Sequence, residues 1–535
     1  MSAPSSPARR NAGVTVPLFS LRSPHSWGIG EITDLPAFGA WVATAGLALV
    51  QILPLGEMSG GETSPYSALS AFGIDPLYIG IEAVPELADG AGAAALTGDD
   101  RATLERARRA HRIDYGAVRW VKRQALGRAF ASFCEGELAT DGPRAVAFRA
   151  FVAAEVAWLP DYALFRALKD RHGGAAWWDW PSSLARRDEA TLATARSELA
   201  RSILEYEWLQ WLAHEQWAKA RAELAGSGVA VMGDLPFMVA RDSADVWSNQ
   251  REFDNAVAVG VPPDAFDEDG QDWDLPAYDW STMAAGEFAW LRRRAEYAAT
   301  LYDRFRVDHL VGFYRTYSRP RDARRNERGK LVQGTFSPAV EADQLSHGER
   351  VLGAMTASAS ARGGSLIAED LGTVPPFVRA SLARLAVPGY KVLIWEKDGE
   401  HFRDPVAYPE VSVACFGTHD TAPVSAWWEG LAEHERRAVV ELPAVAPRAA
   451  ELGPRYDLAV HEALAYALAG SGSELVLFLV QELLGFRDRI NVPGTVGEHN
   501  WTFRLPVDVA SLARDPYVAD HLRIVADALR RTGRA

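Results

Sequence analysis

Short apolar runs, most of them separated by helical patterns, recur along the chain from about residue 14. A continuous apolar run is typical of a parallel strand buried on both faces. The stretches between the runs repeat apolar residues at helical spacing. Strands that alternate with helices form a parallel sheet, and eight such units predict an α/β fold, the (β/α)8 TIM barrel. The predicted strands are 14–20, 47–53, 228–233, 304–308, 365–369, 390–395, 411–416 and 475–480.

Three stretches are too long to be simple connections within one barrel domain spanning 14–535. Residues from about 85 to 226 are rich in Ala, Arg, Glu and Trp, which predicts an inserted helical subdomain. A second region, about 240–300, is dense in Asp, Gly, Pro and Trp and predicts a loop-rich insertion, which in a compact protein is usually functional. A further helical insertion is predicted at about 421–472, and a disordered tail at 1–13.

Composition narrows the classes of partner. The chain has 56 basic and 70 acidic residues, a net charge of −14, which argues against nucleic acid or an anionic membrane as the main partner. It has no apolar run of about 18 residues, so no membrane span is predicted. The two cysteines, Cys134 and Cys415, lack zinc-like spacing and favour a reducing, cytoplasmic location. Most of the 18 tryptophans are expected in the core, and some as stacking platforms for sugar rings.

Three carboxylates follow predicted strands. Asp308 ends the fourth strand, Glu369 the fifth, and Asp420 comes after the seventh. The C-terminal ends of barrel strands meet at one face, where active sites lie. Glycoside transfer with retention needs a nucleophile and an acid/base about 5–5.5 Å apart, and a third carboxylate can stabilise the charged transition state. Arg306 shares a strand face with Asp308, where its charge favours the ionised carboxylate.

Simpler interpretations exist for each of these residues. A lone Asp at a strand end is more often a helix cap or a salt-bridge partner. Asp370 is expected to face away from Glu369 and to be structural. His419 and Asp420 could be two ligands of a metal, but no third ligand stands at a convincing spacing, so neither a metal nor a cofactor is predicted. Neutral histidines that hydrogen-bond sugar hydroxyls fit these positions better.

Three motifs around the carboxylates resemble the catalytic motifs of the 4-α-glucanotransferases, or amylomaltases, of glycoside hydrolase family 77. They are Arg306-Val-Asp-His309, Ala368-Glu-Asp-Leu-Gly372 and Gly417-Thr-His-Asp420. Further matching segments occur in family order from about residue 14 to the C-terminus. They are Gln51–Gly56, Ser64–Tyr66, Ser70–Phe72, Gly233–Pro236, Asp242–Trp247, Gly260–Asp264, Arg489–Gly494 and Asn500–Trp501.

The resemblance implies a role for each matching residue. Asp308 would be the nucleophile, Glu369 the general acid/base and Asp420 the transition-state stabiliser. The sugar next to the broken bond would be bound by Arg306, His309 and His419. The other implied substrate contacts are Ser64, Tyr66, Asp234, Gln271, Trp273 and Asn500. Loop packing stays open as an alternative for Tyr66 and Trp273, and a turn cap for Asp234.

The resemblance also implies an activity. A maltooligosaccharide or other α-1,4-glucan is cleaved, and its non-reducing part is passed from the nucleophile to the 4-hydroxyl of another sugar. A mainly hydrolytic α-glucanase and a non-catalytic glucan-binding protein are the alternatives. The sequence departs from the family pattern at Leu310–Pro320 and at Asp274–Leu275. These departures are expected to affect donor length, acceptor preference and the ratio of transfer to hydrolysis.

Overall fold

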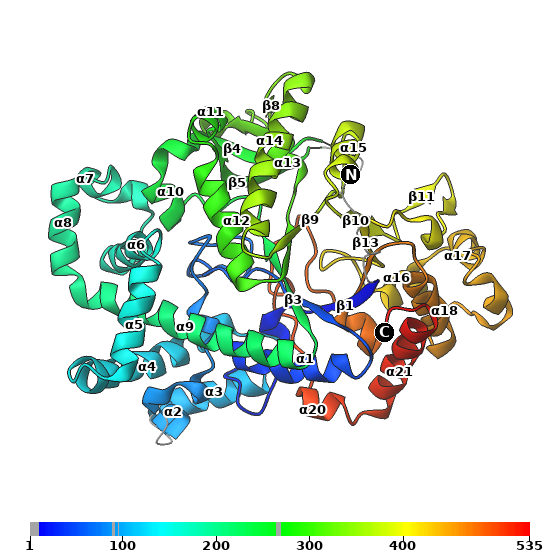
Figure 1. Cartoon of the computed structure of the whole chain (residues 1–535), viewed down its shortest axis with the longest axis horizontal. Helices are drawn as coiled ribbons and strands as arrows, with labels where there is room; N and C mark the ends of the chain where they lie inside the picture. The colour runs from blue at the N-terminus through cyan, green and yellow to red at the C-terminus, as the bar shows by residue number, and fades with distance from the viewer. Residues whose placement is uncertain (1–9, 88–90, 95, 264–268) are drawn as a thin grey trace, which may run out of the picture.

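The chain is built around a closed barrel of parallel strands (Figure 1). The computed structural model describes residues 10–87, 91–94, 96–263 and 269–535. In these ranges the barrel has eight strands that neighbour one another in chain order, and the last pairs with the first. The predicted (β/α)8 fold is therefore confirmed. The strands are β1 (Asn11–Thr15), β2 (Leu49–Gln51), β3 (Ala230–Leu235), β6 (Arg304–Val307), β9 (Ser365–Ala368), β10 (Gly389–Val392), β13 (Ser412–Cys415) and β14 (Leu475–Leu479).

Side chains alternate between two apolar layers along the barrel strands. In β6, Phe305 and Val307 are fully buried in the main core, so Arg306 between them points to the other face of the strand. That other face is filled by a separate apolar cluster of strand residues. The cluster consists of Leu49, Met232, Ile367, Tyr390, Val392, Val413, Cys415, Leu475 and Leu477.

The first strand begins earlier than predicted. Strand β1 covers Asn11–Thr15, whereas residues 18–20 form a 3-10 turn, so the prediction of a strand over 14–20 is wrong at both ends. The backbone N–H of Asn11 donates to Glu474 O at 2.8 Å, which places 11–13 in the barrel and not in a tail. The polar residues around Asn11 hid this strand from a search for apolar runs. The rest of the predicted tail, residues 1–9, lies outside the described residues.

Helices fill most of the long segment between β2 and β3 (Figure 1). The longest of them, α9, packs against α1 (Leu35–Ala43) of the barrel and against α6. The remaining division into subdomains stays a prediction. The helices are α2 (Ala91–Ala94), α3 (Gly98–Arg109), α4 (Tyr115–Phe133), α5 (Pro143–Ala154), α6 (Leu159–Arg171), α7 (Ser182–Ala185), α8 (Glu189–Glu198) and α9 (Ala200–Gly226).

The region predicted as loop-rich contains part of a second sheet. Strands β4 (Phe253–Val261) and β5 (Gln271–Tyr278) join β7 (Thr316–Pro320) and β8 (Thr335–Ser337) in a four-stranded antiparallel sheet. The prediction is therefore wrong for both β4 and β5. The pairing of β4 with β5 shifts register twice, so the strands lack a regular alternation of apolar and polar residues. Helices α10 (Ala244–Ser248), α11 (Trp280–Ala285) and α12 (Ala289–Leu301) surround this hairpin in the sequence.

The C-terminal half adds a short hairpin, β11 (Lys397–Asp398) and β12 (His401–Phe402), and helices on the outside of the barrel (Figure 1). Of these helices, α18 packs against the C-terminal α21. The helices are α13 (Val311–Tyr314), α14 (Glu341–Ser360), α15 (Pro376–Arg384), α16 (Val424–Gly430), α17 (Glu433–Val440), α18 (Leu458–Ala469), α19 (Val480–Leu484), α20 (Val509–Leu512) and α21 (Pro516–Arg531).

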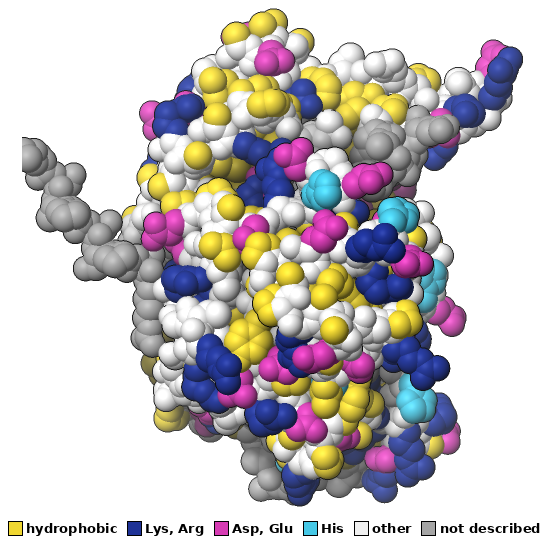
Figure 2. Space-filling view, turned by 90° about the vertical axis from the view of Figure 1, so that its right-hand side faces the viewer, with side chains coloured by type: hydrophobic (Ala, Val, Ile, Leu, Met, Phe, Trp, Pro, Cys, Tyr) yellow, Lys and Arg dark blue, Asp and Glu magenta, His cyan; other side chains and the backbone are white. Residues whose placement is uncertain are grey.

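The surface mixes charges of both signs. Acidic and basic side chains are interspersed over the face shown in Figure 2.

Cys134 and Cys415 are both free thiols. Among the described helices, none is both long and apolar enough to cross a membrane.

Candidate active site

Loops at the C-terminal ends of several barrel strands bring polar side chains to one cavity of about 840 Å³. Asp308 and His309 follow β6, Glu369 follows β9, and Asp420 follows β13. The cavity is lined by eleven of the twelve residues that the sequence suggested. They are Ser64, Tyr66, Gln271, Trp273, Arg306, Asp308, His309, Glu369, His419, Asp420 and Asn500. The barrel therefore gathers these residues from widely separated parts of the chain.

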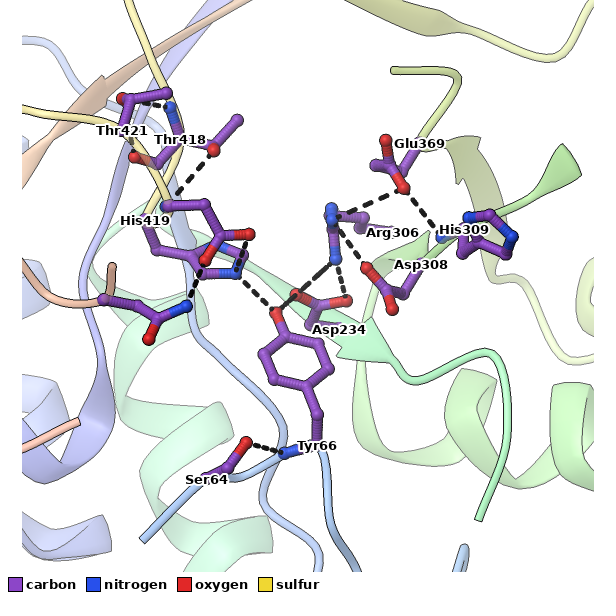
Figure 3. Close-up of polar contacts among 12 residues, drawn as sticks. Ser64, Tyr66, Asp234, Arg306, Asp308, His309, Glu369, Thr418, His419 and Thr421 are labelled. Atoms are coloured by element: carbon purple, nitrogen blue, oxygen red, sulfur yellow. Dashed lines mark hydrogen bonds and ion pairs between the residues drawn. The ribbon is translucent and has the colours of Figure 1, made fainter. Parts of the chain in front are cut away.

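A single buried arginine, Arg306, contacts carboxylates from three neighbouring strands (Figure 3). Its Nη1 donates to both carboxylate oxygens of Asp234, at 2.8 and 2.9 Å. Its Nη2 lies 2.7 Å from Asp308 Oδ1 and 3.8 Å from Glu369 Oε2. Such charge-assisted contacts are stronger than neutral hydrogen bonds, so one cation fixes the relative positions of the acids.

Glu369 is held in a setting that suits proton transfer. Its Oε2 accepts a hydrogen bond from the His309 N–H at 2.7 Å, and its Oε1 accepts one from the Leu371 N–H at 2.9 Å. Burial raises the pKa of Glu369 to about 7, and the charge of Asp308 adds to this, against the lowering effect of Arg306 and of the two N–H groups. Both protonation states are therefore populated near neutral pH, as a general acid/base requires.

Asp420 faces the cavity with a side chain that is 36% exposed. Its Oδ1 accepts a hydrogen bond from Asn491 Nδ2 at 2.7 Å, and Arg489 donates to its backbone oxygen at 2.8 Å. Its Oδ2 lies 3.5 Å from His419 Nε2. Within the described ranges there is no group of three or more His, Cys, Asp or Glu side chains that could hold a metal ion.

Tyr66 lies between Asp234 and His419 and contacts both (Figure 3). Its hydroxyl donates to Asp234 Oδ2 at 2.7 Å and lies 3.0 Å from His419 Nε2. The rings of Tyr66 and His419 stack, with centroids 5.5 Å apart. The Tyr66 N–H donates to Ser64 Oγ at 3.3 Å. These bonds place the ring of Tyr66 between strand β3 and the residues after β13.

His309 is a neutral imidazole at pH 7, because burial lowers its pKa to about 4. The residue has a φ of +43°, which directs the chain sharply away from the end of β6. Its ring is nearly perpendicular to that of Trp273, with centroids 4.8 Å apart, and Trp273 Nε1 donates to Gln271 Oε1 at 3.0 Å. A neutral imidazole has one donor and one acceptor nitrogen, which suits hydrogen bonding to a sugar hydroxyl.

Two of the suggested substrate contacts also bind protein neighbours. The side chain of Asp234 is fully buried, and both its oxygens are used by Arg306 and Tyr66, so it lies behind the cavity wall. The amide of Asn500 accepts from the Val492 N–H at 2.9 Å and donates to Thr495 O at 2.8 Å. Both residues therefore order the groups that face the cavity. A turn cap, the alternative considered for Asp234, is not the interaction seen.

Two residues that sequence reasoning missed also belong to the site. Asn491 holds Asp420 and lines the cavity; it lies within the Arg489–Gly494 motif, which gave a signal for the segment but not for this side chain. Trp395 lines the cavity and is 47% exposed. Its signal was its place just after β10, where the ends of barrel strands carry functional groups.

Both departures from the family pattern lie at the cavity wall. Arg315 and Tyr317 line the cavity, the second from within β7. Asp274 in β5 forms ion pairs with Arg321 and Arg324, so it connects the β4–β5 hairpin to the segment after β7. The unusual residues therefore line the cavity or connect the strands that line it.

Comparison with known proteins decides the family. The family model described as 4-alpha-glucanotransferase matches residues 16–509. The chain belongs to the 4-alpha-glucanotransferase family. The 4-alpha-glucanotransferase of Thermus thermophilus is 32% identical over 523 residues, covering 95% of this chain and 97% of that protein. The 4-alpha-glucanotransferase of Synechocystis sp. is 31% identical over 537 residues, covering 98% of each chain.

A solved structure agrees with this assignment. The amylomaltase from Streptococcus agalactiae in complex with acarbose matches with a TM-score of 0.81 and 26% identity, over 97% of this chain and 99% of that chain. The protein is thus a 4-alpha-glucanotransferase, an enzyme that transfers α-1,4-glucan segments. The mainly hydrolytic α-glucanase and the non-catalytic glucan-binding protein considered from the sequence are not favoured.

Proposed function

We propose that Asp308, Glu369 and Asp420 carry out glucan transfer with retention of configuration. Asp308 attacks C1 of the donor sugar, while the protonated Glu369 gives its proton to the leaving glycosidic oxygen. This forms a covalent glycosyl ester and an ionised Glu369. The ionised Glu369 then takes the proton of an acceptor 4-hydroxyl, which attacks C1 and releases Asp308. Asp420 stabilises the positive charge that develops on the sugar in both steps.

The observation that best supports these roles is the Arg306 contact with two carboxylates of different surroundings. Asp308 is paired with this cation at 2.7 Å and is 26% exposed to the cavity. Glu369 is more deeply buried, lies 3.8 Å from the cation, and has its pKa raised to about 7 by burial. Two carboxyl groups with divergent environments are the usual basis for assigning a nucleophile and an acid.

The neighbouring polar groups fit a sugar-binding role. Arg306, the neutral imidazole of His309, and His419 are placed to bind hydroxyls of the sugar next to the broken bond. Ser64, Tyr66, Gln271 and Trp273 line the same cavity and would contact further glucose units, with Trp273 offering an apolar ring. Asp234 supports them from behind through its contact with Arg306, and Asn500, which lines the cavity, also orders residues 492–495.

We assign maltooligosaccharides and longer α-1,4-glucans as donor and acceptor. A cavity of about 840 Å³ is large enough for more than one sugar unit. A cytoplasmic location agrees with the two free cysteines.

The test replaces the proposed nucleophile by its isostere. Asp308→Asn is expected to lower kcat/KM for maltotriose by about a thousandfold or more, since the ester intermediate then has no carboxylate to form on. Asp303→Asn is the matched control, because Asp303 lies just before the N-terminal end of the same strand, where it pairs with Arg221. A variant Asp308→Asn that turns over maltotriose at near-parental rate would show that another residue is the nucleophile.

A further inference from the structure

The loop that carries Tyr66 has a closed base. Residues 57–73 form this loop, here called the Tyr66 loop, which comes after β2. The Leu69 N–H donates to Glu57 O at 2.7 Å, and the Glu57 N–H donates to Gly73 O at 3.2 Å. The backbone of Glu57 therefore joins both sides of the loop at its base. A shift of Glu57 would therefore move both ends of the loop that carries Tyr66.

The side chain of Glu57 anchors this base to the inserted helices. It is 5% exposed, and one carboxylate oxygen accepts a hydrogen bond from the Tyr162 hydroxyl on α6. The other oxygen lies 3.0 Å from Arg166 Nε, also on α6. The Tyr162 hydroxyl in turn accepts from Gln210 Nε2 on α9 at 2.9 Å. A buried carboxylate must keep such partners, so the geometry of Glu57 is fixed by α6 and α9.

Helix α9 holds the neighbouring backbone with two glutamines of identical chemistry. Gln210 accepts from the Ile74 N–H and donates to Ile74 O, both at 2.9 Å. Gln216 accepts from the Gly80 N–H at 2.7 Å and donates to Gly80 O at 3.0 Å. The contact of Gln210 with Ile74 lies beside the end of the Tyr66 loop, and the contact of Gln216 with Gly80 lies further along the chain. Gln216 therefore provides a control for loss of a buried α9 contact outside the Tyr66 loop.

We propose that Glu57 is a positioning residue of the transfer reaction, which sets the place of Tyr66 by anchoring the Tyr66 loop to α6. The Tyr66 hydroxyl bridges Asp234 and His419 at 2.7 and 3.0 Å. A displacement of about 1 Å would break both bonds, and misplacements of this size can cost about a hundredfold in rate. The proposal rests on the proposed role of Tyr66 at the sugar-binding floor. It makes part of the helical insertion a support for the active site.

The first experiment compares kcat/KM for maltotriose in three single variants. Glu57→Gln keeps the shape of the side chain but removes its charge, and is expected to lower kcat/KM about tenfold. Tyr162→Phe removes only one hydroxyl and is expected to lower it about threefold, so it serves if Glu57→Gln fails to fold. Gln216→Met is expected to lower the melting temperature while leaving kcat/KM within about twofold of the parent. If Gln216→Met loses as much kcat/KM as Glu57→Gln, or as Tyr162→Phe where that variant replaces it, the proposal is overturned.

The second experiment separates positioning of Tyr66 from general weakening. Glu57→Gln, or Tyr162→Phe in its place, is introduced into a Tyr66→Phe background. If Glu57 acts through the Tyr66 hydroxyl, changing Glu57 in this background lowers kcat/KM by less than about twofold. The hydroxyl that Glu57 would position is already absent there. The same fold-loss in both backgrounds overturns the proposal.

The outcome for Tyr66 alone also decides the matter. If Tyr66→Phe retains the parental kcat/KM, the Tyr66 hydroxyl contributes nothing to the reaction. Positioning it could then not explain an effect of Glu57, and the proposal is overturned. The assignment of Asp308 as nucleophile is unaffected by that result. It is judged separately by the inactivity of Asp308→Asn.

Discussion

At the scale of single residues, Glu369 and Asp308 differ in how far each is withdrawn from water. The Glu369 side chain is 11% exposed and receives two backbone N–H groups, whereas Asp308 is 26% exposed and pairs directly with Arg306. Burial penalises the charged form of Glu369, and the nearby negative charge of Asp308 adds to this. The same arginine therefore contacts two acids in different surroundings.

This difference predicts the alkaline side of the pH profile. The proton that Glu369 must donate is held below its pKa of about 7 and is lost as the pH rises through that value. The kcat/KM for maltotriose should therefore fall about tenfold per pH unit at pH values above the pKa of Glu369. Initial rates between about pH 5 and 9 measure it. A profile that stays level from neutral to alkaline pH contradicts the assignment of Glu369 as the acid.

The residues of the site were predictable from sequence to different degrees. Asp308, Glu369 and Asp420 stand at the ends of strands with recognisable motifs, and the barrel brings them to one cavity. The sequence does not reveal whether a polar side chain faces the cavity or lies behind it. Asp234 is fully buried behind Arg306, and only three-dimensional packing determines that. The motif alone did not reveal this burial.

At the scale of elements, the inserted helices are tied to the barrel by buried polar contacts. Lys122 on α4 is 2% exposed, and its Nζ lies 2.7 Å from Glu31 Oε1. It also donates to Leu77 O and Ile79 O, at 2.6 and 2.7 Å. One ammonium group thus joins α4 to the segment after the Tyr66 loop and to the turn before α1.

Removing this ammonium should weaken the fold but not the chemistry. Lys122→Met would leave Glu31 buried without its counter-charge, which typically costs about 3–5 kcal/mol in free energy of unfolding. We expect a loss of about 3 kcal/mol in denaturant unfolding, with kcat for maltotriose within about twofold of the parent at a temperature where the variant is folded. An unchanged unfolding midpoint would show that the contact contributes no net stability.

Elements were predictable where their burial was uniform. Strands such as β14 are buried along their whole length and read as continuous apolar runs. Strand β1 starts in a polar segment at Asn11, and β4 combines exposed and buried residues with register shifts, so neither has a clear period. The β4–β5 hairpin is nevertheless part of the site, because it carries Gln271 and Trp273 to the cavity.

At the scale of the whole molecule, one end of the barrel is enclosed by segments inserted at several points in the chain. The β4–β5 hairpin, the Tyr66 loop and residues 491–501 all contribute lining residues to the cavity. On the proposed mechanism, such an arrangement would surround the reacting sugar with protein groups. We therefore expect a bound acceptor sugar to compete with water for the glycosyl intermediate.

Maltotriose distinguishes transfer from hydrolysis. We expect glucose together with oligosaccharides longer than maltotriose, while the number of reducing ends stays constant to within about a tenth, because each transfer breaks one bond and makes another. Chromatography of the products with a parallel reducing-end assay measures both. Reducing ends that rise in step with the loss of maltotriose, with no longer products, would identify a hydrolase.

The central claim, that Asp308 carries the glycosyl group, is tested most directly by trapping the intermediate. Glu369→Gln should still be glycosylated by an α-glucosyl donor with an activated leaving group such as fluoride, which needs little protonation, while transfer to an acceptor is slowed. Intact mass followed by peptide mapping should locate one glucosyl group on Asp308. A glucosyl group on a different residue would contradict the account, as would fast release of fluoride without any adduct.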